Sequence, residues 1–213
     1  AKVTAIGSYA NDGVLARYNQ TILGGLQQRF GAENTLFASG CQADGEDCAL
    51  LCATPDTSAI SAALAQCSAS IVVTGTVTNG ELGTPPNCDG TSIHYEAEGS
   101  DRPNTTLAAT ALLKAVATAA QATDLPTPHK VVLLLVNAGS VELAWPKASS
   151  SVGAILHSSF PGQAAGKAAA AVLSGDAVPA GRLALTYFDG LERSLPPISN
   201  YSMTNRTYRY LTP

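Results

Sequence analysis

The stretch "HKVVLLLVNAG", residues 129–139, predicts the fold of this 213-residue chain. Every residue between Lys130 and Asn137 is Val or Leu. A membrane-spanning helix needs about 20 apolar residues, so this run is too short to cross a bilayer. An uninterrupted aliphatic run is typical of a strand that is buried on both faces, as in a parallel sheet covered by helices. We therefore expect a central parallel strand here.

Strand and helix patterns alternate on both sides of this run. Further strands are expected at 2–7, 34–40, 70–77, 152–160 and 181–188, and helices at 21–30, 57–65, 106–122 and 162–176. Ile22, Leu23, Leu26 and Phe30 form the apolar stripe of the first helix; Thr57 or Ser58 is expected to cap the second, and Gly175 to stop the last. This alternation predicts α/β architecture, a layered α/β/α sandwich around a mostly parallel sheet. We expect one domain over 1–213, with a C-terminal strap at about 190–213 packed across the layers.

Composition limits the classes of partner. Charged residues make up only 13% of the chain, about half the usual ~25%, and the net charge is −4. Since no run of Lys or Arg is present, neither nucleic acid nor an anionic membrane surface is an expected partner. No apolar segment is long enough for a membrane span. The chain begins without Met, so we expect that a signal peptide was removed or that it is a piece of a longer protein.

Two features predict an extracellular location. Four glycosylation sequons are present, more than the one or two expected by chance; they begin at Asn19, Asn104, Asn200 and Asn205. The cysteines, all candidates for disulfides, fall in one window: Cys41, Cys48, Cys52, Cys67 and Cys88. Their number is odd, so at least one thiol is free or pairs outside the chain. The alternative, a zinc site, is disfavoured because no pair has C-x2-C spacing, and we expect no metal.

Carboxylates gather in "YEAEGSDR", residues 95–102. Glu96, Glu98 and Asp101 are expected on an irregular loop after a strand, where open α/β sheets usually place their ligand site, and Arg102 is the expected counter-charge. A Glu on such a loop acts as a general acid if burial raises its pKa. The alternative is a local salt-bridge cluster without chemistry. The residues alone favour the second interpretation.

Several motifs occur together in one order along the chain: "KVTAIGSYAND", "FASGC", "SIVVTG", "EAEGSDR", "KVVLLLVNAGSVEL", "FPGQAAGKAAAAVLSGDAVPAGRLALTYF" and "NRTYRY". This series resembles the C-terminal α/β sandwich domain of family 3 glycoside hydrolases, closest to the β-xylosidase and β-glucosidase branch. The resemblance implies that Glu96 is the general acid/base and that Asp101 and Arg102 are structural. It also implies that the nucleophile, an Asp, lies on a separate N-terminal (β/α)8 barrel, which this chain lacks.

The sequence departs from that pattern near the loop. A sequon at Asn104 follows Arg102, a long Gly- and Pro-rich stretch precedes Glu96, and "NAGSVEL" stands where the family has Gly-Gly-Pro. Because retaining hydrolysis takes two carboxylates about 5 Å apart, the favoured hypothesis is a secreted, glycosylated, non-catalytic module with a role in structure, assembly or glycan contact. The alternative is the C-terminal part of a retaining β-xylosidase or β-glucosidase, bound to a barrel chain. A third is a carbohydrate-binding module.

Other candidate residues favour packing over chemistry. His94, His129 and His157 are scattered, and no Gly-x-Ser-x-Gly elbow is present, so a hydrolase triad is not predicted. No nucleotide-binding glycine pattern occurs, and no cofactor is expected. Trp145 and Tyr208 are able to stack on a sugar, but we expect them to fill gaps between layers. Expected partners are other protein chains, by self-assembly or with a barrel domain, N-linked glycans and β-linked carbohydrate.

Overall fold

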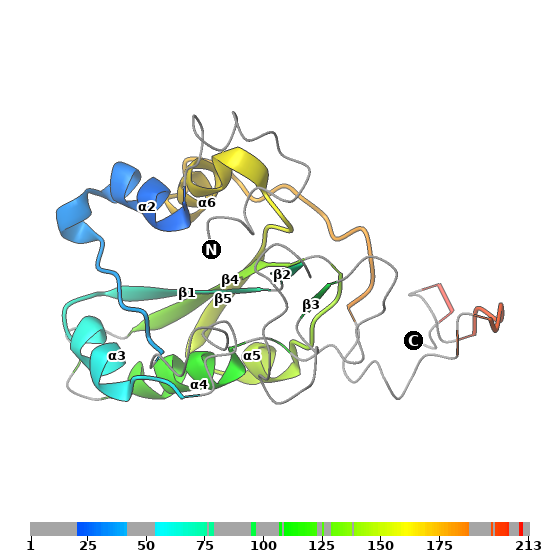
Figure 1. The fold of residues 1–213 in the computed structure, drawn as a ribbon, viewed down its shortest axis with the longest axis horizontal. Coiled ribbons are helices and arrows are strands. Elements are labelled where there is room, and N and C mark those ends of the chain that lie inside the picture. The colour runs from blue at the N-terminus through cyan, green and yellow to red at the C-terminus, as the bar shows by residue number, and fades with distance from the viewer. Residues whose placement is uncertain are drawn as a thin grey trace.

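The computed structural model describes residues 21–41, 54–75, 77–78, 95–96, 107, 109–122, 125, 129–137, 139–187, 197, 199–204 and 209–210. Its strands are β1 Ala69–Gly75, β2 Val77–Thr78, β3 Tyr95–Glu96, β4 Lys130–Val136 and β5 Val152–His157. Its α-helices are α2 Ile22–Phe30, α3 Thr57–Leu64, α4 Thr110–Ala119, α5 Ala144–Ala148 and α6 Ala165–Leu173, and short 3-10 turns span Ala32–Asn34 and Gly162–Ala164. The predicted alternation of strands and helices is confirmed for these elements (Figure 1).

A parallel sheet in the order β1-β4-β5 forms the centre of the described chain. β1 pairs with β4 over the full length of both strands, from Ala69↔Lys130 to Gly75↔Val136. β4 pairs with β5, and the register shifts between Val131 and Val132. Since β4 lies between two strands and is buried on both faces, its neighbours satisfy both rows of backbone groups. The prediction made from its aliphatic run is confirmed.

Helices cover both faces of this sheet (Figure 1). α2 and α6 lie together on one face, and α3, α4 and α5 lie on the other. Alternate residues of β4 face the second layer, where they join one apolar cluster whose members include Ile60, Leu64, Leu113, Val116, Val131, Leu133 and Leu135. This arrangement confirms the α/β/α sandwich.

Caps and glycines explain where the helices begin and end. The Thr21 hydroxyl accepts a hydrogen bond from Gly24 N at 3.0 Å and starts α2. The cap of α3 is Asp56, not Thr57 or Ser58: its Oδ1 accepts from Ala59 N at 3.0 Å and from the Ser58 hydroxyl. A carboxylate is an equally good acceptor for the first turn, which explains the displaced boundary. α6 stops just before Gly175, whose φ of 80° favours glycine, as predicted.

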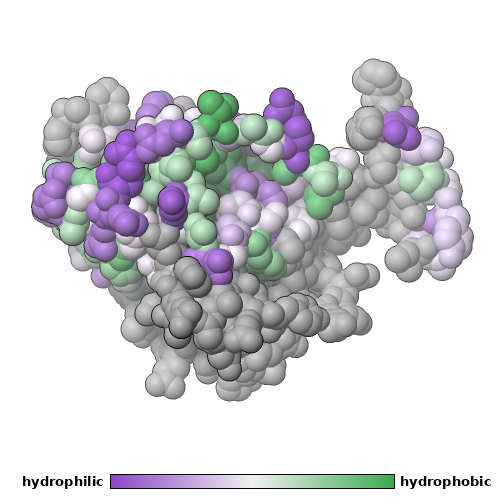
Figure 2. All heavy atoms as spheres, turned by 90° about the horizontal axis from the view of Figure 1, so that it is seen from above, coloured by the Kyte–Doolittle hydropathy of each residue, from purple (hydrophilic) through white to green (hydrophobic). Residues whose placement is uncertain are grey.

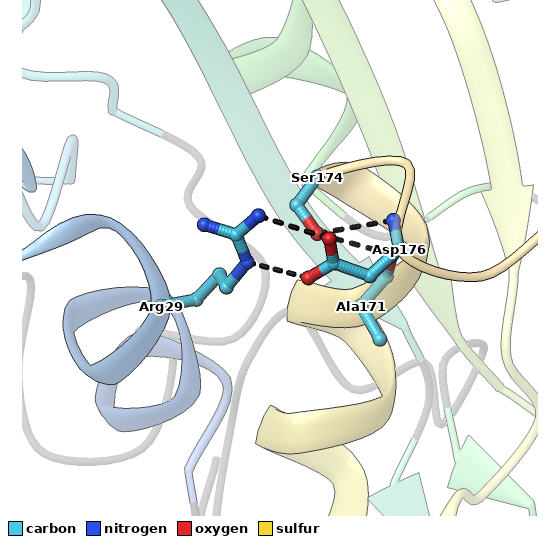
Figure 3. Close-up of polar contacts among 4 residues, drawn as sticks. All are labelled: Arg29, Ala171, Ser174 and Asp176. Atoms are coloured by element: carbon cyan, nitrogen blue, oxygen red, sulfur yellow. Dashed lines mark hydrogen bonds and ion pairs between the residues drawn. The ribbon is translucent and has the colours of Figure 1, made fainter.

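The layer of α2 and α6 is held by a close backbone contact and an ion pair. A Cβ added at Gly25 would lie 2.1 Å from the backbone of Gly166, so the helices touch where neither has a side chain. At the ends of the two helices, the Arg29 guanidinium donates to both carboxylate oxygens of Asp176, at 2.5 and 2.9 Å (Figure 3). Phe30, expected on the buried stripe, is instead partly exposed at the helix end, where the Arg29 guanidinium lies 5.4 Å from its ring.

Two expected strands are wrong in the described residues. Residues 35–40 take no regular structure, and Phe37 is 71% exposed. Residues 181–187 also form no strand, and Leu183 is 58% exposed. Both segments have the apolar composition of strands, but a strand exists only where a neighbour supplies hydrogen-bond partners, and neither is paired with the described sheet.

Two predicted segments, the first strand and the C-terminal strap, lie wholly or partly outside the described residues. The strand at 2–7 lies outside the described residues, as do residues 189–196 of the expected strap. The strap residues that are described, 197, 199–204 and 209–210, are exposed, and Figure 1 shows them at one end of the molecule. No helix in the described ranges is long and apolar enough to cross a membrane.

Candidate active-site region at the carboxyl end of the sheet

Glu96 lies beyond the carboxyl end of β1. The short strand β2 begins two residues after β1 ends, and β3 pairs with it in parallel through Val77↔Tyr95 and Thr78↔Glu96. The backbone of Glu96 is therefore fixed at the end of a strand, and not on an irregular loop as expected. The carboxyl ends of parallel strands are where open α/β sheets bind their ligands. Glu98, Asp101 and Arg102 lie outside the described residues, so their clustering stays a prediction.

A hydrogen-bonded group occupies the carboxyl ends of β4 and β5. Asn137, the residue after β4, is fully buried, and its Nδ2 donates to Gly139 O at 3.0 Å. Its backbone oxygen is 3.1 Å from Nε2 of His157, the last residue of β5. Asn137 thus links the turn after β4 to the end of β5. Its Oδ1 is buried and has no hydrogen-bond partner among the described residues.

Tyr187 completes this group from a segment far along the chain. Its ring meets the His157 ring edge to face, with centroids 5.8 Å apart and planes at 76°. Ser158 closes the turn after β5, since its N–H and hydroxyl both donate to Leu135 O at 3.0 Å. The next residue, Ser159, has a φ of 49°, a left-handed conformation that is uncommon for a residue other than glycine.

The sequence pattern did not predict this group. The sequence pattern predicts a packing role for His157, and it places Asn137 and Tyr187 in strand segments rather than among the candidate site residues. The signal that points to them is positional: a polar residue directly after a buried aliphatic strand lies at the ligand-binding edge of a parallel sheet. Nothing in the sequence pattern, however, predicts that Tyr187 reaches the same edge.

The remaining histidine of the described chain lies at the opposite end of the sheet. His129 precedes β4 and is buried, and its Nε2 is 2.8 Å from the Ser70 hydroxyl near the start of β1. Burial lowers the pKa of His129 below its usual value, so the neutral ring is favoured in the folded chain. The pair is separated from Glu96 by the length of β1, which supports a packing role. His94 lies outside the described residues.

Two of the five cysteines lie in the described residues. Cys41 is disulfide-bonded, whereas Cys67 is a free thiol and so is not the disulfide half-cystine that its position suggested; the other three lie outside the described residues. Within the described ranges, no three His, Cys, Asp or Glu side chains gather as a metal site would require.

Trp145 of α5 packs against the apolar cluster, with Lys114 Nζ 5.5 Å from its ring centroid. That environment favours packing over an open sugar platform; Tyr208 lies outside the described residues.

Comparison with known proteins identifies relatives along the whole chain. The family model described as "Glycosyl hydrolase family 3 C-terminal domain" matches residues 1–210. The β-xylosidase/α-L-arabinofuranosidase 2 of Medicago sativa subsp. varia is 26% identical over 96% of this chain, which corresponds to 23% of that protein. The xylan 1,4-β-xylosidase of Xylanibacter ruminicola is 38% identical over 37% of this chain and 9% of its own length.

A solved structure has the same fold. The exo-β-xylosidase XlnD, in complex with a xylobiose aziridine activity-based probe, superposes with a TM-score of 0.56 at 23% identity, over 87% of this chain and 20% of its own. The chain therefore spans less than a quarter of the length of each of these proteins.

Proposed function

This chain belongs to the glycosyl hydrolase family 3 C-terminal domain family, and on that basis we propose that it supplies one half of the active site of a retaining β-xylosidase-like glycosidase. In this proposal Glu96 is the general acid/base, and the nucleophile comes from a unit outside the chain. The observation that carries the proposal is the β2–β3 pairing, which sets Glu96 past the carboxyl end of β1.

Chemistry requires the second unit. In retaining hydrolysis, one carboxylate attacks the anomeric carbon while the other gives its proton to the departing glycosidic oxygen. The second group, here Glu96, then takes a proton from the water that releases the sugar. Because the nucleophile that forms the covalent intermediate is proposed to lie outside the chain, we expect the isolated chain to be inactive.

The substrate class follows from the relatives. Their names describe action on xylan and on β-xylosides, and for this chain a β-linked xyloside is the proposed substrate. A β-glucoside is the alternative, because the sequence motifs resemble both branches of the family. Asn137, His157 and Tyr187 lie at the same edge of the sheet as Glu96 and are proposed to form the wall of the site on this side.

A second candidate function is a secreted, glycosylated module without catalytic activity, acting by assembly with other chains or by contact with glycans. It is favoured by the sequon at Asn104, which lies two residues after Arg102 and would place a glycan beside the acidic loop. Exposed apolar side chains, among them Val178, Leu183 and Leu185, offer a surface for another protein. The cysteine-rich window supports an oxidising, extracellular location for both candidates.

An assay with two substrates separates the candidates. The chain is combined with the N-terminal barrel of a family 3 β-xylosidase, and hydrolysis of xylobiose and of 2,4-dinitrophenyl β-xyloside is measured. We expect Glu96→Gln to lower kcat on xylobiose by about 10²- to 10⁴-fold, the usual contribution of general acid catalysis. On the dinitrophenyl substrate, we expect Glu96→Gln to lower the rate of the first step, formation of the glycosyl-enzyme, by a smaller factor. That leaving group departs without a proton.

Glu98→Gln is the matched control, since it removes a carboxylate only two positions along the sequence from Glu96. It is expected to retain most of the activity. Full activity of Glu96→Gln on xylobiose, or an inactive complex in which the barrel is correctly bound, favours the non-catalytic module. Hydrolysis by the chain without any barrel contradicts both candidates.

A further inference from the structure

The sequon Asn200-Tyr201-Ser202 lies entirely on the surface. All three residues are exposed, and Tyr201 is 89% exposed. Figures 1 and 2 both show the described residues of the C-terminal segment at one end of the molecule, apart from the sandwich. A large enzyme therefore has access to this tripeptide in the folded chain.

The local backbone presents Asn200 in a compact turn. Its N–H donates to Pro197 O at 2.8 Å, and its Oδ1 accepts a hydrogen bond from Ser202 N at 3.0 Å. The second bond folds the Asn200 amide and Ser202, whose hydroxyl defines the sequon, into one loop. Asn200 and Ser202, the two residues that define the sequon, are therefore presented together in one exposed turn.

We propose that Asn200 is a site of N-linked glycosylation. The donor would be an oligosaccharide linked to a lipid diphosphate. Nδ2 forms a bond to the anomeric carbon of the sugar, the bond from that carbon to the diphosphate oxygen breaks, the lipid diphosphate leaves, and one Nδ2 proton passes to a base of the transferase. The site rests on the secretory location proposed above, because the sequon is modified only in that pathway.

A glycan at this position has a physical role. Tyr201 and Met203 are exposed apolar side chains on the same short segment, which itself takes no helix or strand. Such a segment is a site for association between chains. A hydrated, bulky glycan on Asn200 covers these side chains and keeps the segment soluble.

The test is glycopeptide mapping of the full chain secreted from a eukaryotic cell. Treatment with a peptide N-glycosidase in ¹⁸O water hydrolyses the Asn side-chain amide, releases the glycan and leaves ¹⁸O-labelled Asp at each occupied position, which mass spectrometry locates. We expect label at Asn200 in the wild type and in Ser202→Thr, which keeps the hydroxyl. Complete loss is expected in Ser202→Ala. Ser199→Ala is the control, because it removes a hydroxyl from the same turn but outside the sequon.

The outcomes are distinct from those of the glycosidase assay. Asn200 without label, while another sequon is labelled, overturns the site but leaves the secretory location intact. A chain secreted without any N-linked glycan overturns the site and removes the support that the sequons give to that location; neither result changes the Glu96 prediction. Greater self-association of Ser202→Ala, reversed by adding Tyr201→Ser, supports the shielding role, and equal association of wild type and Ser202→Ala overturns it.

Discussion

The ion pair between Arg29 and Asp176 fastens α2 to the turn after α6, and it gives a pH-dependent prediction (Figure 3). The side-chain hydrogen bond from Arg29 lowers the pKa of Asp176 to about 2. A carboxyl whose pKa is lowered on folding stabilises the fold above its unfolded pKa, near 3.9, and this contribution is lost as the pH falls toward 2. Asp176→Asn is therefore expected to lower the melting temperature at pH 5–7 by a constant amount and to have no effect near pH 2.

The expected shift is at most about 2 °C, because the two side chains are 44% and 49% exposed and the pair is screened by salt. Thermal unfolding of the wild type, Arg29→Gln, Asp176→Asn and the double variant measures the coupling. A difference that persists unchanged at 1 M salt, or that grows below pH 4, contradicts this account. The pair joins residues 147 positions apart, which explains why no local sequence pattern predicted it.

The sequence pattern predicted those helices and strands in which local conformational preference and tertiary packing favour the same structure. The run at 131–136 is aliphatic because β4 is buried on both faces, and the α6 segment combines high helix propensity with a glycine stop. The patterns failed at 35–40 and 181–187, where strand composition is present without a paired neighbour in the described sheet. Strand formation depends on a second segment, whereas a helix satisfies its own backbone.

The contact between α2 and α6 predicts different effects for alanine substitutions at Gly25 and at its neighbour in the chain, Gly24. Gly25→Ala places a methyl group 2.1 Å from the Gly166 backbone, so the helices have to move apart. Alanine raises helix propensity by ~1 kcal/mol, but overpacking of this kind costs about 1–3 kcal/mol. Because the clash is with backbone atoms and not with a flexible side chain, the cost lies in the upper part of that range, and we expect a net loss of about 1–2 kcal/mol, seen as a fall of about 2–8 °C in melting temperature.

Gly24→Ala is the matched control, because it changes the same helix by the same group one position earlier. Among the described residues, its added methyl group meets the Thr21 hydroxyl alone, at 3.2 Å. We expect Gly24→Ala to be neutral or slightly stabilising in the same denaturation series. Equal destabilisation by both substitutions would show that the helix backbone, and not the interhelical contact, is the cause.

At the scale of the whole molecule, the candidate site was predicted only in part from the sequence. The resemblance to the family implies a role for Glu96, and the β2–β3 pairing places its backbone beyond the carboxyl end of β1, the side on which open α/β sheets usually bind ligands. Asn137, His157 and Tyr187 come to that edge from three separate segments, so their proximity depends on the tertiary fold. A pattern read along one segment at a time has no means to predict such a group.

Exposed apolar side chains at 183 and 185 predict association with another protein surface. Leu183 and Leu185 are exposed on a segment that has strand composition but no paired neighbour in the described sheet, and such a surface costs little to bury against another unit. We expect sedimentation velocity to show self-association of the isolated chain, and tight binding when a family 3 barrel is added. Leu183→Ser with Leu185→Ser should weaken both at least about tenfold, the loss expected when two anchoring apolar contacts are removed.

The same double variant should melt within about 2 °C of the wild type, because exposed side chains contribute little to the fold of the chain itself. Phe37→Ser is the control, since it removes a more exposed apolar side chain from another segment. A strictly monomeric chain with no affinity for the barrel would contradict the prediction. If Phe37→Ser weakens binding as much as the double variant, the contact surface is not confined to 181–187, and general apolar exposure is the better explanation of the association.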